Sequence, residues 1–188
     1  MKLDDAIKQR RSIKRFDLKK PDWRKIIRAI DVARFAPCAG NQFVTRFILV
    51  SNEKKIKELS AASQQDFVGT AQYIVVAVSD DSHLIRDYGK RGTRYCSQQA
   101  GAAIENFLLA LVEQKLVTTW VGHFYEEQVR RTLGIPEGLH IEALFPIGIE
   151  TKIKTREKRK MNLDHILYFD KWKNYKMAPM IKVSKEAI

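Results

Sequence analysis

The chain has 188 residues, of which 45% are apolar and 10% aromatic, and this is the size and composition of one globular domain with a buried core. Fibrous and intrinsically disordered proteins are thereby excluded. No apolar run reaches the roughly 20 residues that a bilayer span requires, and acidic residues occupy positions 4 and 5, where a secretory signal would have its apolar region, so we expect a cytoplasmic protein without membrane contact.

The formal net charge of +12 is concentrated at the two ends of the chain. Lys and Arg outnumber Asp and Glu by 11 to 4 in residues 1–28 and again by 11 to 4 in residues 151–188, whereas residues 29–150 carry 12 basic and 14 acidic side chains. Two basic ends that meet in the fold would form one concentrated anion-binding region, and we do not expect nucleic acid as the partner.

The hydrophobic pattern mixes helices and strands without a regular alternation, which predicts an α+β fold rather than a doubly wound sheet. Helical periodicity predicts helices over residues 3–11, 21–36, 53–63, 97–115 and 126–134, and β-rich apolar runs predict strands over residues 46–51, 72–79, 117–124 and 140–150. We expect Pro21 at the first helical position and Gly134 at a helix end. Helix 97–115 is nearly apolar on every side through its middle, so we expect it to be buried by a sheet or by another subunit and to have two covers.

The chain is expected to be a single domain, residues 1–188, with a basic C-terminal extension from about residue 151. The extension is expected to contain a short helix and an extended tail. The segment "RDYGKRGTRY", residues 86–95, mixes aromatic and cationic side chains as surfaces that bind single-stranded nucleic acid do, but we favour a loop beside the substrate or a solvated face.

The segment "QRRSIKRF", residues 9–16, places four cations within six positions. Neither the glycine-rich dinucleotide motif nor the P-loop pattern is present, so cationic side chains would have to hold any phosphate. Guanidinium groups bind phosphate oxygens bidentately, and the Ser12 hydroxyl can donate one more hydrogen bond. On charge alone, a solvated surface is an equally good interpretation.

The segment "APCAGN", residues 36–41, follows the second predicted helix. Pro37 ends the helix, Gly40 permits close approach of the backbone, and Asn41 carries an amide that both donates and accepts. Taken alone, this pattern favours a simple turn between a helix and a strand.

Together, in this order and about 25 residues apart, the two segments resemble the nitroreductase family of flavin-dependent oxidoreductases. The resemblance continues through "GAAIENFLLALVEQKLVTTWVGHF", "VRRTLGIPEGLHIEALFPIGIE" and "KRKMNLDHILYFDKW", and it is weakest between Ser60 and Gln99. It implies a central, mostly antiparallel sheet flanked by helices, a homodimer that packs through its long central helix, and FMN bound at the subunit interface.

The resemblance also assigns roles to individual residues. The FMN phosphate, ribityl chain and pyrimidine edge would be contacted by Arg10, Arg11, Ser12 and Lys14, while Arg15 would face water. The isoalloxazine would be lined across the interface by Pro37, Cys38 and Asn41. Backbone atoms would approach the flavin near N5 in Trp120, Val121 and Gly122, and the late cations on the phosphate would be Lys158 and Lys160, with Arg159 competing for this place.

Two departures from the family pattern are visible. After Asn41 the family often continues with Gln-Pro-Trp one residue later, and this chain has Phe43, Val44 and Thr45 there. Cys38 replaces a common serine, which keeps a small polarizable side chain but weakens its hydrogen bond. These changes leave FMN binding expected and the substrate preference open.

The implied function is an FMN-dependent oxidoreductase that passes two electrons from NADH or NADPH to a small organic acceptor, such as a nitroaromatic or quinone, by a ping-pong mechanism. No side chain needs to act as an essential acid, because solvent can supply protons to an exposed acceptor. Two alternatives remain open: a specialised reaction, such as reductive dehalogenation or flavin-ring chemistry, and a non-catalytic protein that binds flavin or nucleic acid.

Other chemistry has weaker support in the sequence. The four histidines have no metal-ligand spacing, so we expect no metal site, although His123 directly follows the expected flavin turn. Cys38 lacks a nearby histidine in sequence that would activate it as a nucleophile. We expect Cys38 and Cys96 to be free thiols.

Overall fold

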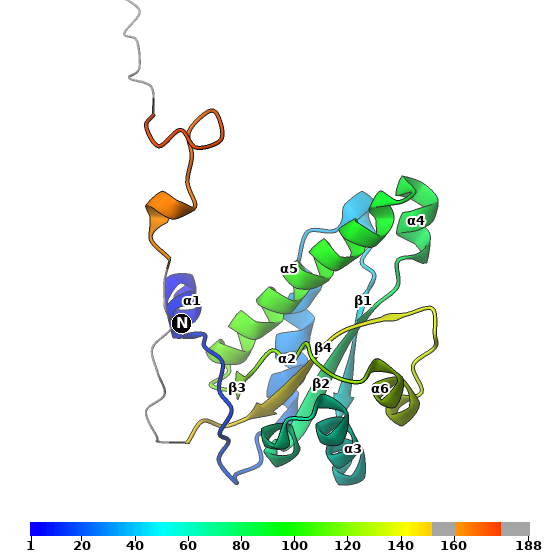
Figure 1. Ribbon diagram of the computed structural model, residues 1–188. Helices are drawn as coiled ribbons and strands as arrows, with labels where there is room; N and C mark the ends of the chain where they lie inside the picture. The colour runs from blue at the N-terminus through cyan, green and yellow to red at the C-terminus, as the bar shows by residue number, and fades with distance from the viewer. Residues whose placement is uncertain (152–160, 178–188) are drawn as a thin grey trace, which may run out of the picture. The chain divides into compact units, whose positions relative to one another are not determined.

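The computed structural model describes residues 1–151 and 161–177, and the chain divides into two units, Met1–Thr155 and Arg156–Ile188. In the described part of the first unit, four strands form one antiparallel sheet in the order β1-β2-β4-β3 (Figure 1). Their bounds are Thr45–Val50 for β1, Tyr73–Ser79 for β2, Val117–Thr118 for β3 and His140–Gly148 for β4. The predicted α+β class and the antiparallel sheet are confirmed.

Strand β2 lies in the interior of the sheet and is buried along its whole length. Its register with β1 runs from Thr45 opposite Ser79 to Val50 opposite Ile74. Strand β1 is an edge strand whose middle residues are only partly buried. Both strands lie where they were predicted, but β1 is less deeply buried than β2, and its outer edge is not paired by any described residue.

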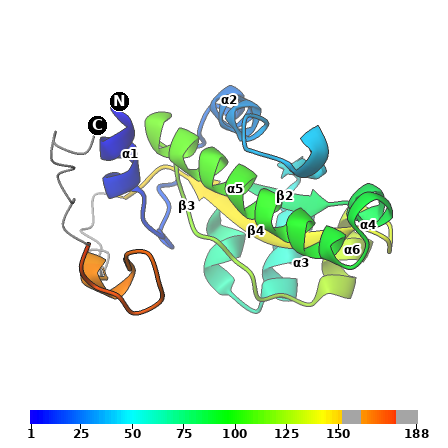
Figure 2. The same ribbon diagram turned by 90° about the horizontal axis from the view of Figure 1, so that it is seen from above.

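Helices cover both faces of the sheet (Figure 2). One face is covered by α2 (Trp23–Ala33) and α5 (Arg91–Glu113), and the other by α3 (Glu53–Ser63) and α6 (Glu126–Leu133). Successive side chains of a strand point to opposite faces of the sheet, so alternate residues of β2 pack into the two cores. Val75 and Ala77 pack into the core under α2 and α5, whereas Ile74 and Val76 pack into the core under α3 and α6.

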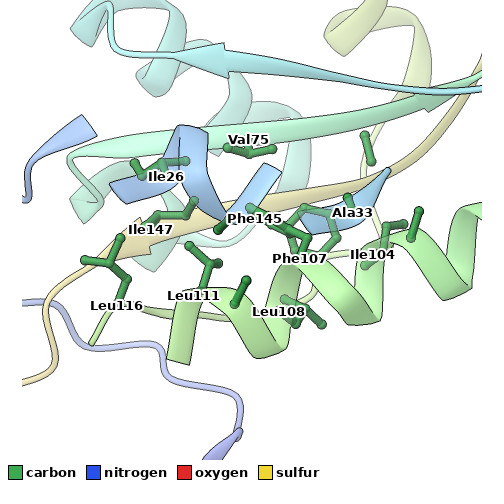
Figure 3. Close-up of a cluster of buried hydrophobic side chains, with 14 of the residues drawn as sticks. Ile26, Ala33, Val75, Ile104, Phe107, Leu108, Leu111, Leu116, Phe145 and Ile147 are labelled. Carbon is green, nitrogen blue, oxygen red and sulfur yellow. The ribbon is translucent and has the colours of Figure 1, made fainter. Parts of the chain in front are cut away.

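The core under α5 is built around aromatic side chains (Figure 3). Phe107 of α5 and Phe145 of β4 are fully buried, with ring centroids 5.6 Å apart in an edge-to-face arrangement. Full burial of one such side chain contributes roughly 2–3 kcal/mol to folding. This packing fixes α5 on the sheet, and α5 in turn supplies walls to the cavities described below.

Short-range capping sets the helix ends. The Asp22 carboxylate accepts a hydrogen bond of 3.0 Å from the amide of Arg24 and makes Asp22 the N-cap of α2. Pro21 therefore lies before the cap, and its predicted place at the first helical position is wrong. Gly134, with a φ of 70°, ends α6 as predicted.

Residues 86–95, expected to be a loop beside the substrate or a solvated face, are mostly exposed, as a solvated face would be, but they are mostly helical and not a loop. They contain the end of α4 (Ser82–Tyr88), Gly89 with a φ of 57°, and the first turn of α5, which begins at Arg91 rather than at residue 97. Gly92 belongs to this packing: a Cβ there would lie 2.4 Å from backbone atoms of Leu84 and Ile85. Gly92 therefore allows α4 and α5 to approach each other closely.

Helix α5 has one buried and one exposed face. The exposed face includes Gln98 and Glu105, with a partly exposed Gly101 between them, and the described residues leave open space beside the Gly101 Cα. The sheet, with α2 beside it, is thus the first of the two expected covers, and the described residues leave the face around Gly101 open.

The predicted strand over residues 117–124 is much shorter in the structure. After β3, the chain leaves the ladder at Thr119 and returns to it only at Val121, which bridges to Leu144.

No helix in the described ranges, 1–151 and 161–177, is long and apolar enough to cross a membrane.

The second unit is described over residues 161–177. It contains a 3-10 turn, η3 (Leu163–His165), which corresponds to the predicted short helix. Rings of Tyr168 and Trp172 pack with centroids 4.6 Å apart, and Tyr175 packs on Tyr168 at 5.1 Å.

Candidate functional site

The basic segment after α1 (Leu3–Gln9) is fastened to β3. The amide of Ile13 donates to the Thr118 carbonyl at 3.0 Å, and the Thr119 hydroxyl donates to the Ile13 carbonyl at 2.7 Å. The Ile13 side chain is 1% exposed and anchors the segment in the interior. The polar residues on either side of Ile13 are thereby held at fixed places on the surface.

A cavity of about 610 Å³ lies between this segment and the C-terminal half of α5. Its polar rim includes Arg10, Arg11 and Ser12, and Trp120 lies at the same cavity. Its apolar walls come from Leu108, Leu111, Val112, Leu116 and Ile149. An apolar cavity of this size with a few convergent polar groups is typical of a cofactor or substrate site.

Two carboxylates face the arginines inside this cavity. The Arg10 Nε lies 3.3 Å from the Glu105 Oε1, and the Arg11 Nη2 lies 2.5 Å from the Glu150 Oε1. All four side chains are partly exposed, so an incoming anion can reach the guanidinium groups. The carboxylates fix the orientation of the arginines and compete with such an anion.

The remaining cations of the basic cluster lie outside the cavity. Lys14 is exposed, and its Nζ lies 5.0 Å from the ring centroid of Phe67, in the short turn η2 (Asp66–Thr70). Arg15 is exposed, as predicted. Lys158 and Lys160, together with Arg159, lie outside the described residues.

The segment predicted to approach the flavin begins at the cavity and then turns away from it. The Trp120 ring packs edge-to-face on Phe145 with centroids 5.5 Å apart. Val121 is buried and exchanges two backbone hydrogen bonds with Leu144, of 3.0 and 2.9 Å. Gly122 and His123 are exposed beyond it. Of this segment, Trp120 is the residue that lines the cavity.

The other predicted set of ligands lies beside a second cavity, of about 240 Å³. Pro37 and Cys38 form one wall, and the opposite wall is supplied by Tyr95, Gln98, Gln99 and Ala102 of α5. Asn41 is exposed next to this cavity in the chain, with a φ of 57°.

The two cavities use different stretches of the same helix. Residues 95–102 of α5 line the cavity of Cys38, and residues 105–112 line the cavity of Arg10. At 1.5 Å per residue, the two stretches are centred about 15 Å apart along the helix axis. Figure 1 shows the N-terminal segment at one end of α5 and the light-blue turn near the other. Within one chain, the two predicted sets of ligands are therefore separate.

Three residues of these cavities were not singled out from the sequence. Glu105 and Glu150 meet Arg10 and Arg11 only through the fold, so no local pattern marks them. Gln99 is 5% exposed, and neither atom of its side-chain amide has a hydrogen-bond partner in the described part of the chain. The sequence signal that could have identified Gln99 is its position, as a glutamine, on the core-facing side of an otherwise apolar helix.

Comparison with known proteins agrees with this architecture. The sequence model of the Nitroreductase family matches residues 7–67 and 58–149. A crystal structure of a nitroreductase family protein from Clostridium novyi NT superimposes with a TM-score of 0.73 and 27% identity, covering 93% of this chain and 96% of that one. The chain belongs to the nitroreductase family of flavin oxidoreductases.

Two further relatives are similar over most of their length. A protein of Archaeoglobus fulgidus described as an NADH dehydrogenase/NAD(P)H nitroreductase is 27% identical over 143 residues, which are 74% of this chain and 80% of that one. The iodotyrosine deiodinase of Thermotoga neapolitana is 23% identical over 173 residues, or 84% of this chain and 93% of the relative. The resemblance stated from the two N-terminal motifs is confirmed at the level of the family.

Proposed function

We propose that the protein is an FMN-dependent oxidoreductase that takes electrons from NADH or NADPH and passes them to a small organic acceptor. The observation that carries the proposal is the cavity of about 610 Å³ in which Arg10, Arg11 and Ser12 meet an apolar wall. Solved relatives of the same fold include an FMN-dependent nitroreductase from Clostridium difficile and an iodotyrosine deiodinase bound to FMN and 3-iodo-L-tyrosine.

The residues present fit the chemical parts of FMN. The two guanidinium groups can exchange their carboxylate partners for phosphate oxygens, and the exposed Ser12 hydroxyl can add a hydrogen bond. The apolar wall from α5 excludes water from a planar ring. When bound, the flavin supplies reversible two-electron chemistry, and the chain binds it and orients it.

Lys14 requires a change of position for its proposed contact with the pyrimidine edge. Its ammonium group lies over Phe67, and a flexible, exposed lysine can leave such a position at a cost of about 0.5–1 kcal/mol. A cation placed at that edge stabilises the negative charge that develops when the ring is reduced.

A homodimer would join the two separate ligand sets. If two copies pack their α5 helices antiparallel, residues 95–102 of one copy meet residues 105–112 of the other, because the two cavities follow each other along the helix. Pro37 and Cys38 of one copy would then face the Arg10 cavity of its partner. The exposed face of α5 supports such an interface, and so do the exposed apolar side chains of Leu3 and Ile7 in α1, Val32 in α2 and Phe35 just after α2.

The first test is reconstitution of the purified protein with FMN, followed by anaerobic addition of NADH or NADPH. We expect bound FMN, bleaching of its visible absorbance by a nicotinamide donor, and a dimer by light scattering. A protein that takes up no FMN would contradict the proposal, and one that binds FMN that neither donor can reduce would indicate a non-catalytic flavin binder.

A matched pair of variants tests the assignment of the phosphate site. Arg10→Met should weaken FMN binding about tenfold or more, since a charged hydrogen bond contributes roughly 1.5–3 kcal/mol. Binding of riboflavin, which lacks the phosphate, should change much less. Arg15→Met removes an equal charge from the same cluster outside the cavity, and it should leave both affinities within about twofold.

The acceptor is then identified by turnover with nitroaromatics, quinones, oxygen and 3-iodo-L-tyrosine. The last compound is included because the deiodinase of Thermotoga neapolitana aligns with 84% of this chain. We expect the nitroaromatic or quinone to be the faster acceptor. Faster release of iodide from 3-iodo-L-tyrosine would instead assign reductive dehalogenation.

A further inference from the structure

The turn that carries Pro37 and Cys38 has an unusual backbone. Gly40 and Asn41 are consecutive residues in the left-handed region, with φ values of 56° and 57°. Such a conformation costs a non-glycine residue roughly 1–2 kcal/mol. Strained turns persist where their surroundings hold them, and they cluster at functional sites.

The C-terminal end of α4 contacts this turn directly. The Gln42 Nε2 donates a hydrogen bond of 2.6 Å to the Asp87 Oδ2. The Tyr88 hydroxyl fills the space beside Gly40, since a Cβ built on Gly40 would lie 2.7 Å from this oxygen. Tyr88 is itself supported by Tyr95 of α5, edge-to-face at 5.4 Å, and Tyr95 also lines the Cys38 cavity.

The α4–α5 corner, residues 81–95, is held together by contacts of its own. Gly92 lets the two helices touch, and the Thr93 hydroxyl donates a hydrogen bond of 2.7 Å to the Asp81 Oδ2. Below the turn, Val44 packs in a buried cluster with Leu84 and Cys96, which joins the corner to the start of β1. The corner and the turn thus share both polar and apolar contacts.

We propose that Asp87 and Tyr88 are positioning residues, which hold the Pro37–Asn41 turn in the place from which it contacts the flavin. This inference rests on the proposed function, because it assigns to the turn a role in flavin binding. Asp87 fixes the far end of the turn through Gln42, and Tyr88 closes the side of Gly40. Neither residue lines the cavity of Arg10 or that of Cys38.

The experiment compares the full-length wild type with Asp87→Ala and Tyr88→Ala. Two readouts need no flavin: amide hydrogen exchange over residues 38–42, and the alkylation rate of Cys38, which peptide mass separates from that of the buried Cys96. Two further readouts are the dissociation constant of FMN and the visible spectrum of the bound flavin. Arg86→Gln is the matched control, because it removes the other partner of Asp87 and leaves Gln42 in place.

We expect both alanine variants to speed exchange and alkylation in the turn about tenfold and to weaken FMN binding several-fold, with a shifted flavin spectrum. Asp87→Asn keeps an oxygen acceptor for Gln42, so it should restore most of the wild-type behaviour, and Arg86→Gln should resemble the wild type. The proposal is overturned by unchanged exchange in the turn, or by faster exchange with unchanged FMN affinity and spectrum. A wild type that binds no FMN defeats the proposed function, and the two flavin-free readouts then decide whether the corner holds the turn.

Discussion

The Thr119 hydroxyl donates a 2.7 Å hydrogen bond to the carbonyl of Ile13, and both residues are buried. This bond joins segments 106 positions apart and holds the basic cluster beside the cavity. Thr119→Val should therefore lower the free energy of unfolding by about 1–2 kcal/mol, because it leaves a buried carbonyl without its donor. Chemical denaturation measures this change, and FMN affinity should fall with it.

The neighbouring threonine supplies the control for that variant. The Thr118 hydroxyl makes only a 3.5 Å contact to a carbonyl, so Thr118→Val should cost clearly less than Thr119→Val. Equal losses from the two variants would show that general packing near β3, rather than the bond to Ile13, carries the effect.

Glu105 should oppose FMN binding. Its carboxylate pairs with Arg10, and an approaching phosphate has to displace it. Glu105→Gln should raise FMN affinity about threefold to tenfold at low salt, and less at high salt, since partly exposed charges are screened. Titration of flavin fluorescence measures this affinity, with Glu113→Gln as a control at an exposed position of the same helix. Weaker binding by Glu105→Gln would mean that the carboxylate serves mainly to orient Arg10.

Gly40 and Tyr88 should be energetically coupled. Gly40→Ala introduces a methyl group at a left-handed position and within 2.7 Å of the Tyr88 hydroxyl, and it should cost about 1–3 kcal/mol of unfolding free energy. In a Tyr88→Phe background the next ring atom is 3.6 Å away, so the same change should cost about 0.5–1 kcal/mol less. Additive effects in this double-mutant cycle would contradict the contact.

The buried amide of Gln99 should reduce the stability of the protein in the absence of ligand. Both of its polar atoms are without a partner among the described residues, so the near-isosteric Gln99→Met should raise the free energy of unfolding by about 1 kcal/mol. Gln98→Met, one residue away and exposed, should change it by less than about 0.5 kcal/mol. A destabilising Gln99→Met would show that the amide has a partner in the assembled protein.

Asp81 should make stability dependent on acid pH. Burial by itself raises the pKa of this carboxyl, but hydrogen bonds with Thr93 and His140 outweigh burial and leave the pKa below its usual value. A carboxyl whose pKa is lower in the folded state than in the unfolded state stabilises the fold at pH values above its ordinary pKa of about 4. This contribution to stability is lost as the pH falls through the pKa of the folded state. Asp81→Asn should therefore weaken the dependence of the free energy of unfolding on acid pH, which chemical denaturation at a series of pH values measures.

The sequence was most informative where a local pattern determines a local structure. The period of apolar residues predicted α2, α3 and α6, and the β-rich runs predicted all four described strands, although β3 is much shorter than predicted. These signals depend on side chains that are neighbours in the chain. The sequence did not show that the end of α4 and the start of α5 lie within residues 86–95, where a loop or a solvated face was expected. Gly92 is required by the backbone of a different helix, and no local pattern shows such a contact.

The candidate site likewise contains residues that a local sequence pattern predicts and residues that only the fold brings together. Arg10, Arg11 and Ser12 were identified because they are consecutive, and the structure places them at one cavity together with Trp120. The carboxylates that face the arginines come from α5 and from the end of the last strand, so only the folded chain brings them there. The separation of Cys38 from this cavity likewise depends on the length of α5, which the sequence underestimated.

The two arginine–carboxylate pairs have a consequence for discrimination between anions. A protein of net charge +12 whose cavity held guanidinium groups without carboxylate partners would bind polyanions with little discrimination. Here each guanidinium already has an anionic partner, so a weakly bound phosphodiester gains little by displacing it. Under the proposed function, a dianionic phosphate monoester that also brings an apolar ring to the adjoining wall would gain more from this exchange than a phosphodiester would.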